Sequence, residues 1–155
     1  PLGFSITYRK NRPFPHTLHL VPKTVVLGIG CKRGTEAESI RALIRETLEQ
    51  NQIFKESICL IASIDLKKDE EGIRICAEEL GVPFVTWSAE ELEQVRSEDG
   101  FTESEFVRSV AGVGNVCERS ALKGAGTSRL LIRKTAHNGV TVAAAVKDYT
   151  VCMED

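Results

Sequence analysis

The stretch Thr24–Thr35, with the sequence TVVLGIGCKRGT, constrains the fold more than any other part of the chain. Its first half, residues 25–29, is a continuous apolar run of the kind that forms a buried central strand in a parallel sheet. Two glycines, two bases and a helix-starting pattern follow it directly. A strand, a glycine-rich turn and a helix in this order predict an α/β fold.

The first helix is predicted to begin at Thr35, because Thr35 and Glu38 have the spacing of a capping box. Its inward face should consist of residues that repeat at helical spacing, namely Ile40, Leu43, Ile44, Thr47 and Leu48. We expect it to end near residues 50–52.

A second β-α unit follows the first helix. Residues 57–64 form its apolar strand and residues 65–70 a polar turn. Asp69 is the expected N-cap of its helix, whose inward face consists of Ile73, Cys76, Ala77 and Leu80. Gly81 should end that helix in the left-handed conformation.

A third short strand is expected over residues 83–87. Ser88 and Glu91 then have capping-box spacing, which predicts a short helix through Val95. Thr102 and Glu105 repeat the same spacing after a polar loop.

The C-terminal third predicts a helix and a hairpin. The helix, over residues 113–125, has a face of small residues that suits close packing onto a sheet, namely Cys117, Ala121 and Gly124. Two β-rich runs, 129–135 and 140–146, flank Asn138-Gly139, a strong signal for a tight hairpin turn.

Together these elements predict a three-layer α/β/α fold around a mixed sheet of about five strands, with parallel β-α units and a C-terminal hairpin. Residues 1–22 are rich in proline and are expected to form a linker or arm from an upstream domain. Residues 23–148 then form the domain and residues 149–155 a tail.

Composition narrows the function classes. The formal net charge of −2 argues against a general nucleic-acid binder, and no apolar run is long enough for a membrane span. Five cysteines without C-x-x-C spacing favour the reducing cytoplasm and argue against a zinc ribbon. His16 and His19 have H-x-x-H spacing, but nearby prolines argue against a helix there, so we expect no protein-bound metal.

Chemistry is expected at the carboxyl ends of the strands, where ligands of open α/β sheets lie. Glycines there let a backbone approach a ligand, and a helix N-terminus favours an anion. If the first two strands are neighbours, four bases line one rim, namely Lys32, Arg33, Lys67 and Lys68. The candidate binding set at this rim also includes Gly28, Gly30, Cys31, Gly34 and Ser63.

Several alternatives remain open at this rim. A dinucleotide site is weaker, because the third glycine of G-x-G-x-x-G comes one place late. Cys31 is either a nucleophile, with a thiol pKa lowered by the helix and the bases, or a small residue that fills the turn. Asp69, Glu70 and Glu118 either complement helix dipoles or act as a general acid or base.

The chain resembles the C-terminal domain of CbiG proteins and is similar to stand-alone CobE proteins. The resemblance extends from about Leu20 to Val146. It is carried by LVPKTVVLGIGCKRGT, IASIDLKKDEEGI, ELGVPFVTWSAEEL, GVGNVCERSALKGAG and LLIRKTAHNGVTVAAA. Its most specific parts are the GIGCKRG turn and the element at Lys67, Asp69, Glu70 and Gly72.

The resemblance implies a role in anaerobic cobalamin synthesis. CbiG proteins act as cobalt-precorrin-5A hydrolases, which open the ring lactone of a cobalt-corrinoid and release acetaldehyde. Cobalt would arrive inside the substrate, so no cofactor is expected, and further domains would precede this one. The bases at the rim would then hold carboxylates of the macrocycle, and N–H groups of residues 31–35 would stabilise an oxyanion. The rival hypothesis is a module that binds or transfers a corrinoid while upstream domains perform the chemistry.

Overall fold

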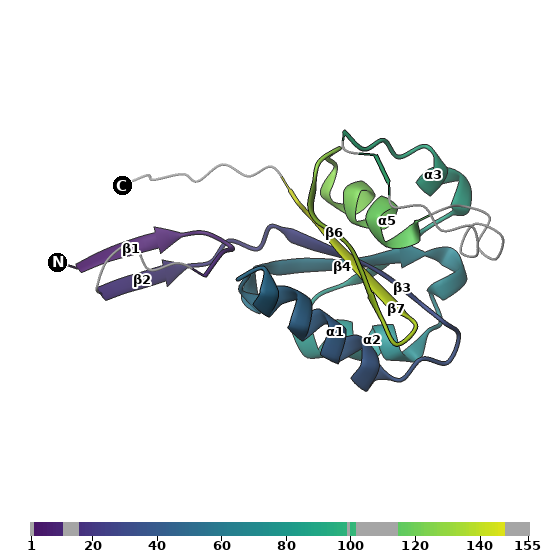
Figure 1. Cartoon of the computed structure of the whole chain (residues 1–155), viewed down its shortest axis with the longest axis horizontal. Helices are drawn as coiled ribbons and strands as arrows, with labels where there is room; N and C mark the ends of the chain where they lie inside the picture. The colour runs from purple at the N-terminus through teal and green to yellow at the C-terminus, as the bar shows by residue number, and fades with distance from the viewer. Residues whose placement is uncertain (1, 11–15, 99, 102–114, 148–155) are drawn as a thin grey trace.

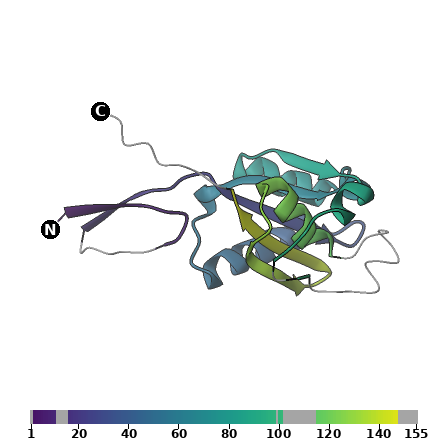
Figure 2. The same ribbon diagram turned by 90° about the horizontal axis from the view of Figure 1, so that it is seen from above.

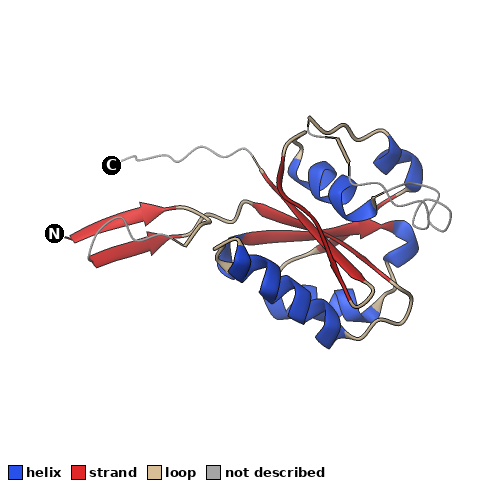
Figure 3. Cartoon of the chain, viewed as in Figure 1, coloured by secondary structure: helices blue, strands red, loops and turns tan. Residues whose placement is uncertain are grey.

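The computed structural model describes residues 2–10, 16–98, 100–101 and 115–147. In this part of the chain a five-stranded sheet lies between two layers of helices (Figures 1 and 3). The predicted three-layer α/β/α architecture with a mixed sheet is therefore confirmed.

The sheet has the strand order β5-β4-β3-β7-β6. Its strands are β3 (Val25–Cys31), β4 (Ile58–Ile64), β5 (Phe84–Trp87), β6 (Leu130–His137) and β7 (Val140–Val146). The first three are parallel, whereas β7 pairs antiparallel with both β3 and β6. Asn138 and Gly139 join β6 to β7 with φ of 51° and 77°, as the predicted hairpin turn requires.

Helices cover both faces of the sheet. The helices α1 (Ala37–Gln50) and α2 (Glu71–Leu80) lie on one face, and α3 (Ala89–Glu93) and α5 (Val116–Ala125) lie on the other (Figure 1). All five predicted inward residues of α1 are buried. Two 3₁₀ turns, η1 (Lys55–Ser57) and η2 (Asp65–Lys67), flank β4.

Two of the predicted helix caps are wrong. The N-cap of α1 is Glu36, and Thr35 instead donates its hydroxyl to the carbonyl of Lys32 at 2.6 Å. The N-cap of α2 is Glu70 rather than Asp69. At Thr35 a turn contact takes the side chain that local pattern assigned to the helix cap. The capping box of Ser88 and Glu91 is confirmed, and Gly81 ends α2 with φ of 70°.

The small face of α5 packs directly on the sheet, as predicted. A Cβ placed on Gly28 of β3 would lie 1.8 Å from the carbonyl oxygen of Cys117 and 2.8 Å from the backbone nitrogen of Ala121. A Cβ on Gly124 would meet Val26 of β3 at 2.8 Å. Glycine on both partners thus lets the helix backbone approach the strand backbone. The helix α5 begins at Val116. The separate capping pattern of Thr102 and Glu105 lies outside the described residues.

The N-terminal segment contains paired strands, which sequence analysis did not predict. The strands β1 (Leu2–Ile6) and β2 (His16–Leu20) form a parallel pair that projects from the domain in both Figure 1 and Figure 2. Between them, Tyr8 accepts from the N–H of Phe54 at 2.8 Å, and Lys10 donates to Gln52 at 2.6 Å. These bonds attach the segment to the loop after α1.

We expect Gly28→Ala to lower the free energy of unfolding by about 3 kcal/mol or more, because the new Cβ can be accommodated only if α5 moves away from β3. Urea unfolding measures the change. Gly81→Ala is the matched control, since its Cβ would meet nothing within 4 Å and would cost only the left-handed backbone strain, about 1–2 kcal/mol. A smaller loss for Gly28→Ala than for Gly81→Ala would contradict this account of the helix–sheet contact.

Candidate functional site

A cavity of about 520 Å³ opens at the carboxyl ends of β3 and β4. Its walls come from the turn after β3, from η2, from the start of α5 and from the β6–β7 hairpin. The residues that line it are Gly30, Cys31, Lys32, Arg33, Ile64, Leu66, Lys67, Asn115, Val116, Cys117, Lys134, Ala136, Gly139, Val140 and Thr141. We call it the edge pocket.

The edge pocket has an apolar interior and cationic walls. Ile64, Val116 and Val140 are buried core residues that form part of its lining. Its four charged lining residues, Lys32, Arg33, Lys67 and Lys134, are all bases, and none of the described residues that line it is a carboxylate. This combination suits a ligand with an apolar body and several negative charges at its edge.

Three of the four predicted rim bases therefore come together, but the fourth does not. Lys68 is exposed and does not line the edge pocket. Asp69 and Glu70 line an adjacent depression of about 620 Å³. That depression shares Arg33 and Leu66 with the edge pocket, so the two carboxylates lie across a common wall from it.

The turn after β3 is held by bonds inside the chain. Glu70 accepts from the N–H of Gly34 at 3.2 Å and lies 4.0 Å from the ammonium of Lys67. The N–H of Lys32 donates to Gly139 at 3.1 Å, and that of Thr35 donates to Lys32 at 3.2 Å. Three of the N–H groups expected to stabilise an oxyanion are thus already used, which contradicts that expectation for Lys32, Gly34 and Thr35.

The predicted lowering of the Cys31 pKa is wrong. Cys31 ends β3, six residues before α1 begins, and is not part of the first turn of the helix. Burial raises the pKa of Cys31, and the negative charge of Glu70 raises it further. The interpretation of Cys31 as a small residue that fills the turn agrees better with this environment than a nucleophilic role.

Two predicted binding residues lie inside the protein. Ser63 is fully buried, and its hydroxyl donates to the carbonyl of Ile29 at 2.7 Å. Gly28 lies beneath α5. Neither residue lines the edge pocket, whereas Gly30 does, and Gly34 supplies the left-handed turn with φ of 76°.

Glu118 lies behind the wall of the edge pocket and is 0% exposed. One of its carboxylate oxygens accepts from the side-chain amide of Asn115, and the other accepts from the backbone N–H of Lys134 at 2.8 Å. Asn115 in turn caps α5 by accepting from the N–H of Glu118 at 3.2 Å. The carboxylate therefore links the start of α5 to β6.

The part of the pocket that the hairpin supplies was not predicted from the sequence. Lys134, Ala136 and Thr141 were not among the candidates, and neither was Leu66, a residue that is 56% exposed at the rim. A signal did exist, because strand alternation places Lys134 and Ala136 on one face of β6. The local pattern does not show which strand β7 pairs with. It therefore does not show which face of β6 lies toward the turn after β3.

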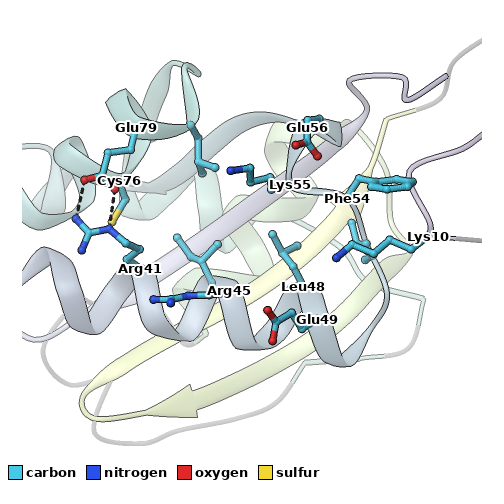
Figure 4. Close-up of a pocket in the computed structure, with 13 residues that line it drawn as sticks. Lys10, Arg41, Arg45, Leu48, Glu49, Phe54, Lys55, Glu56, Cys76 and Glu79 are labelled. Carbon is cyan, nitrogen blue, oxygen red and sulfur yellow. Dashed lines mark hydrogen bonds and ion pairs between the residues drawn. The ribbon is translucent and has the colours of Figure 1, made fainter. Parts of the chain in front are cut away.

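A second cavity of about 570 Å³ lies on the α1–α2 face (Figure 4). Its walls carry both signs of charge: Lys10, Arg41, Arg45 and Lys55 are opposed by Glu49, Glu56 and Glu79. Arg41 and Glu79 form a bidentate ion pair with N–O distances of 2.6 and 2.7 Å. Its charges are mixed and partly paired. This cavity therefore has less unpaired positive charge for an anionic ligand than the edge pocket has.

Neither a metal cluster nor a membrane helix is found in the part of the chain that the structure describes. No group of three or more histidine, cysteine, aspartate or glutamate side chains there is arranged to hold a metal ion. No helix there is long and apolar enough to cross a bilayer.

A family model and several known proteins of cobalamin synthesis match this chain. Residues 25–145 match the family model described as "Cobalamin synthesis G C-terminus". The chain is 34% identical over 128 residues to a cobalt-precorrin-5A hydrolase of Priestia megaterium, covering 83% of this chain and 33% of that protein. It is 38% identical over 134 residues to the Salmonella typhimurium enzyme of the same name, covering 86% and 37%.

A solved structure of CobE, a protein from the cobalamin biosynthetic pathway, superposes on the chain with a TM-score of 0.73. It is 31% identical, and the match covers 81% of this chain and 91% of that one. The chain thus spans about a third of the length of the two curated hydrolases but nearly all of this smaller structure.

The buried thiols predict a loss of stability at high pH. Burial raises the pKa of Cys117 to about 12 from 9.0. The unfolded chain releases this proton near pH 9 while the folded chain keeps it, so the free energy of unfolding falls as pH rises from about 9 to about 12. The slope is at most about 1.4 kcal/mol per pH unit for this thiol.

Urea unfolding at several pH values measures this slope. Cys117→Ala is the matched variant, because it removes one titrating thiol and leaves the lysines that also titrate in this range. We expect a flatter decline in the variant, and equal slopes in the two proteins would refute the role of Cys117.

Proposed function

The chain belongs to the family of cobalamin synthesis G C-terminal domains, and we propose that it is the part of a cobalt-precorrin-5A hydrolase that binds the carboxylate edge of the corrinoid. The observation that carries this proposal is the edge pocket, with four bases around an apolar interior and no carboxylate among its described lining residues. The proposed substrate is a flat macrocycle with acetate and propionate groups around its rim.

Charge and shape both support the proposal. Lys32 and Arg33 are exposed on the turn after β3, Lys67 lies on η2 and Lys134 on β6, so cations approach the opening from three elements. Cations on different walls can pair with carboxylates on different rings of one macrocycle. Apolar lining residues and the exposed side chain of Leu66 then contact its hydrocarbon face.

The proposed reaction opens a lactone and releases acetaldehyde, so it needs a water activated by a base and a donor for the developing oxyanion. Asp69 and Glu70 remain the candidate bases on this chain, because they lie across the Arg33–Leu66 wall from the edge pocket. Glu70 first has to leave Gly34 or share its carboxylate, since it accepts from that N–H. Glu118 is buried behind the pocket and is better suited to holding the wall in place.

A second candidate function is a module that binds or transfers a corrinoid without performing the chemistry. It is favoured by the absence of a carboxylate from the described lining of the edge pocket. The curated hydrolases are about three times as long as the matched region, which leaves room for catalytic groups elsewhere.

One experiment separates the two candidates. This chain and a full-length homologous hydrolase are each incubated anaerobically with cobalt-precorrin-5A, and acetaldehyde and the visible corrinoid spectrum are measured. Acetaldehyde from this chain alone would support hydrolysis within the domain. A spectral change without acetaldehyde would support the binding module.

We expect Lys32→Ala/Arg33→Ala to weaken binding of the corrinoid about 10- to 100-fold, because two charge-assisted contacts are lost. Spectral titration measures the dissociation constant, and added salt should weaken binding to the wild-type chain more than to the variant. Arg45→Ala/Lys55→Ala removes two bases from the other cavity as a matched control and should bind as the wild type does. Equal affinities for all three proteins would exclude the edge pocket as the corrinoid site.

A further inference from the structure

Strand β6 contains a bulge beside the edge pocket. Ile132 is paired with Ala144 and Thr135 with Val142, so three steps along β6 match two along β7. One extra residue therefore lies in the segment that contains Arg133 and Lys134. A bulge of this kind bends a strand and turns a side chain in a new direction, and such bulges occur often beside active sites.

The bulge is held by a buried carboxylate. The backbone N–H of Lys134 donates to Glu118 at 2.8 Å, and Glu118 is 0% exposed. A fully buried carboxylate costs free energy unless its oxygens are hydrogen-bonded. Here Asn115 and Lys134 supply those bonds from two different elements, so the position of Lys134 depends on that of α5.

The side chain of Lys134 lies in the wall of the edge pocket and is partly buried. In the described part of the chain no carboxylate oxygen lies within 4.0 Å of its ammonium group, whereas Lys67 has Glu70 at that distance. Because no carboxylate forms an ion pair with the Lys134 ammonium group in this part of the chain, that group can pair directly with a carboxylate of the ligand.

We propose that Lys134 is the anchor for one carboxylate at the edge of the ligand, and that Glu118 and the β6 bulge are the device that positions it. This inference rests on the proposed corrinoid site and adds the residue that determines specificity within it. It changes the role of Glu118 from a catalytic acid or base to a positioning residue.

The test uses cobyrinic acid, which carries free carboxylates at its rim, and its heptamethyl ester, in which methylation removes those negative charges. The wild-type chain should bind the acid at least about 10-fold more tightly than the ester, because only the acid can pair with the bases. Spectral titration gives the dissociation constants.

Lys134→Met keeps the unbranched shape and most of the length of the side chain and removes its charge. We expect it to bind the acid about 10- to 100-fold more weakly than the wild type and the ester equally well. Lys134→Arg should recover most of the lost affinity. Lys123→Met, on the exposed face of α5, is the matched control and should behave as the wild type.

Glu118→Gln tests the positioning role. Glutamine has nearly the same shape, but its amide nitrogen cannot accept a hydrogen bond, so either Asn115 or Lys134 loses its partner. If Glu118 acts through Lys134, the losses of affinity in Glu118→Gln and Lys134→Met will not be additive. A purely structural role would lower the unfolding free energy and leave the effect of Lys134→Met unchanged.

The outcomes are distinguishable. Equal binding of acid and ester by the wild type, or no binding of either, would overturn the proposed function. Selective binding of the acid together with an unaffected Lys134→Met would overturn the anchor alone. Additive losses would overturn the role of Glu118, and if Glu118→Gln does not fold, the comparison of Lys134→Met with Lys134→Arg still decides whether Lys134 is the anchor.

Discussion

The close contact of α5 with β3 is the constraint on which the rest of the structure depends. The backbone at Gly28 leaves no room for a Cβ beneath Cys117, so the helix lies directly on the central strand. That contact holds the first turns of α5 against β3, and Asn115, Val116 and Cys117 at the start of the helix form one wall of the edge pocket. A glycine that sequence analysis assigned to ligand binding thus acts on the site through packing.

The basic and acidic side chains of the site occupy different places. The bases at the ends of β3 and β4 and on β6 line the pocket, whereas Glu70 and Glu118 accept backbone N–H groups outside its lining. Each carboxylate is used to hold a wall, one at the turn after β3 and the other between α5 and β6. The pocket therefore keeps a positive potential in a chain whose formal net charge is −2.

Much of the fold was predictable because its signals are local. Apolar runs, helical periodicity, the capping box of Ser88 and the Asn138-Gly139 turn each depend on a few neighbouring residues, and the structure confirms them. The two wrong cap predictions share a cause. Thr35 and Asp69 were each assigned as a cap one residue before the observed caps, Glu36 and Glu70, because local pattern locates a helix end only to within one or two residues.

Local sequence signals were enough to identify the strands and helices of the α/β domain, their order and the bases of its first two β-α units, since these follow from periodicity and turn chemistry. Which of these residues share a cavity follows from the way the strands pair and the helices pack. The tertiary structure brought Lys134 from the hairpin to the turn after β3, buried Ser63 and Glu118, and left Lys68 in solvent. The physical reason is that β7 pairs antiparallel with β3, more than a hundred residues away in the chain, through backbone hydrogen bonds that no local pattern encodes.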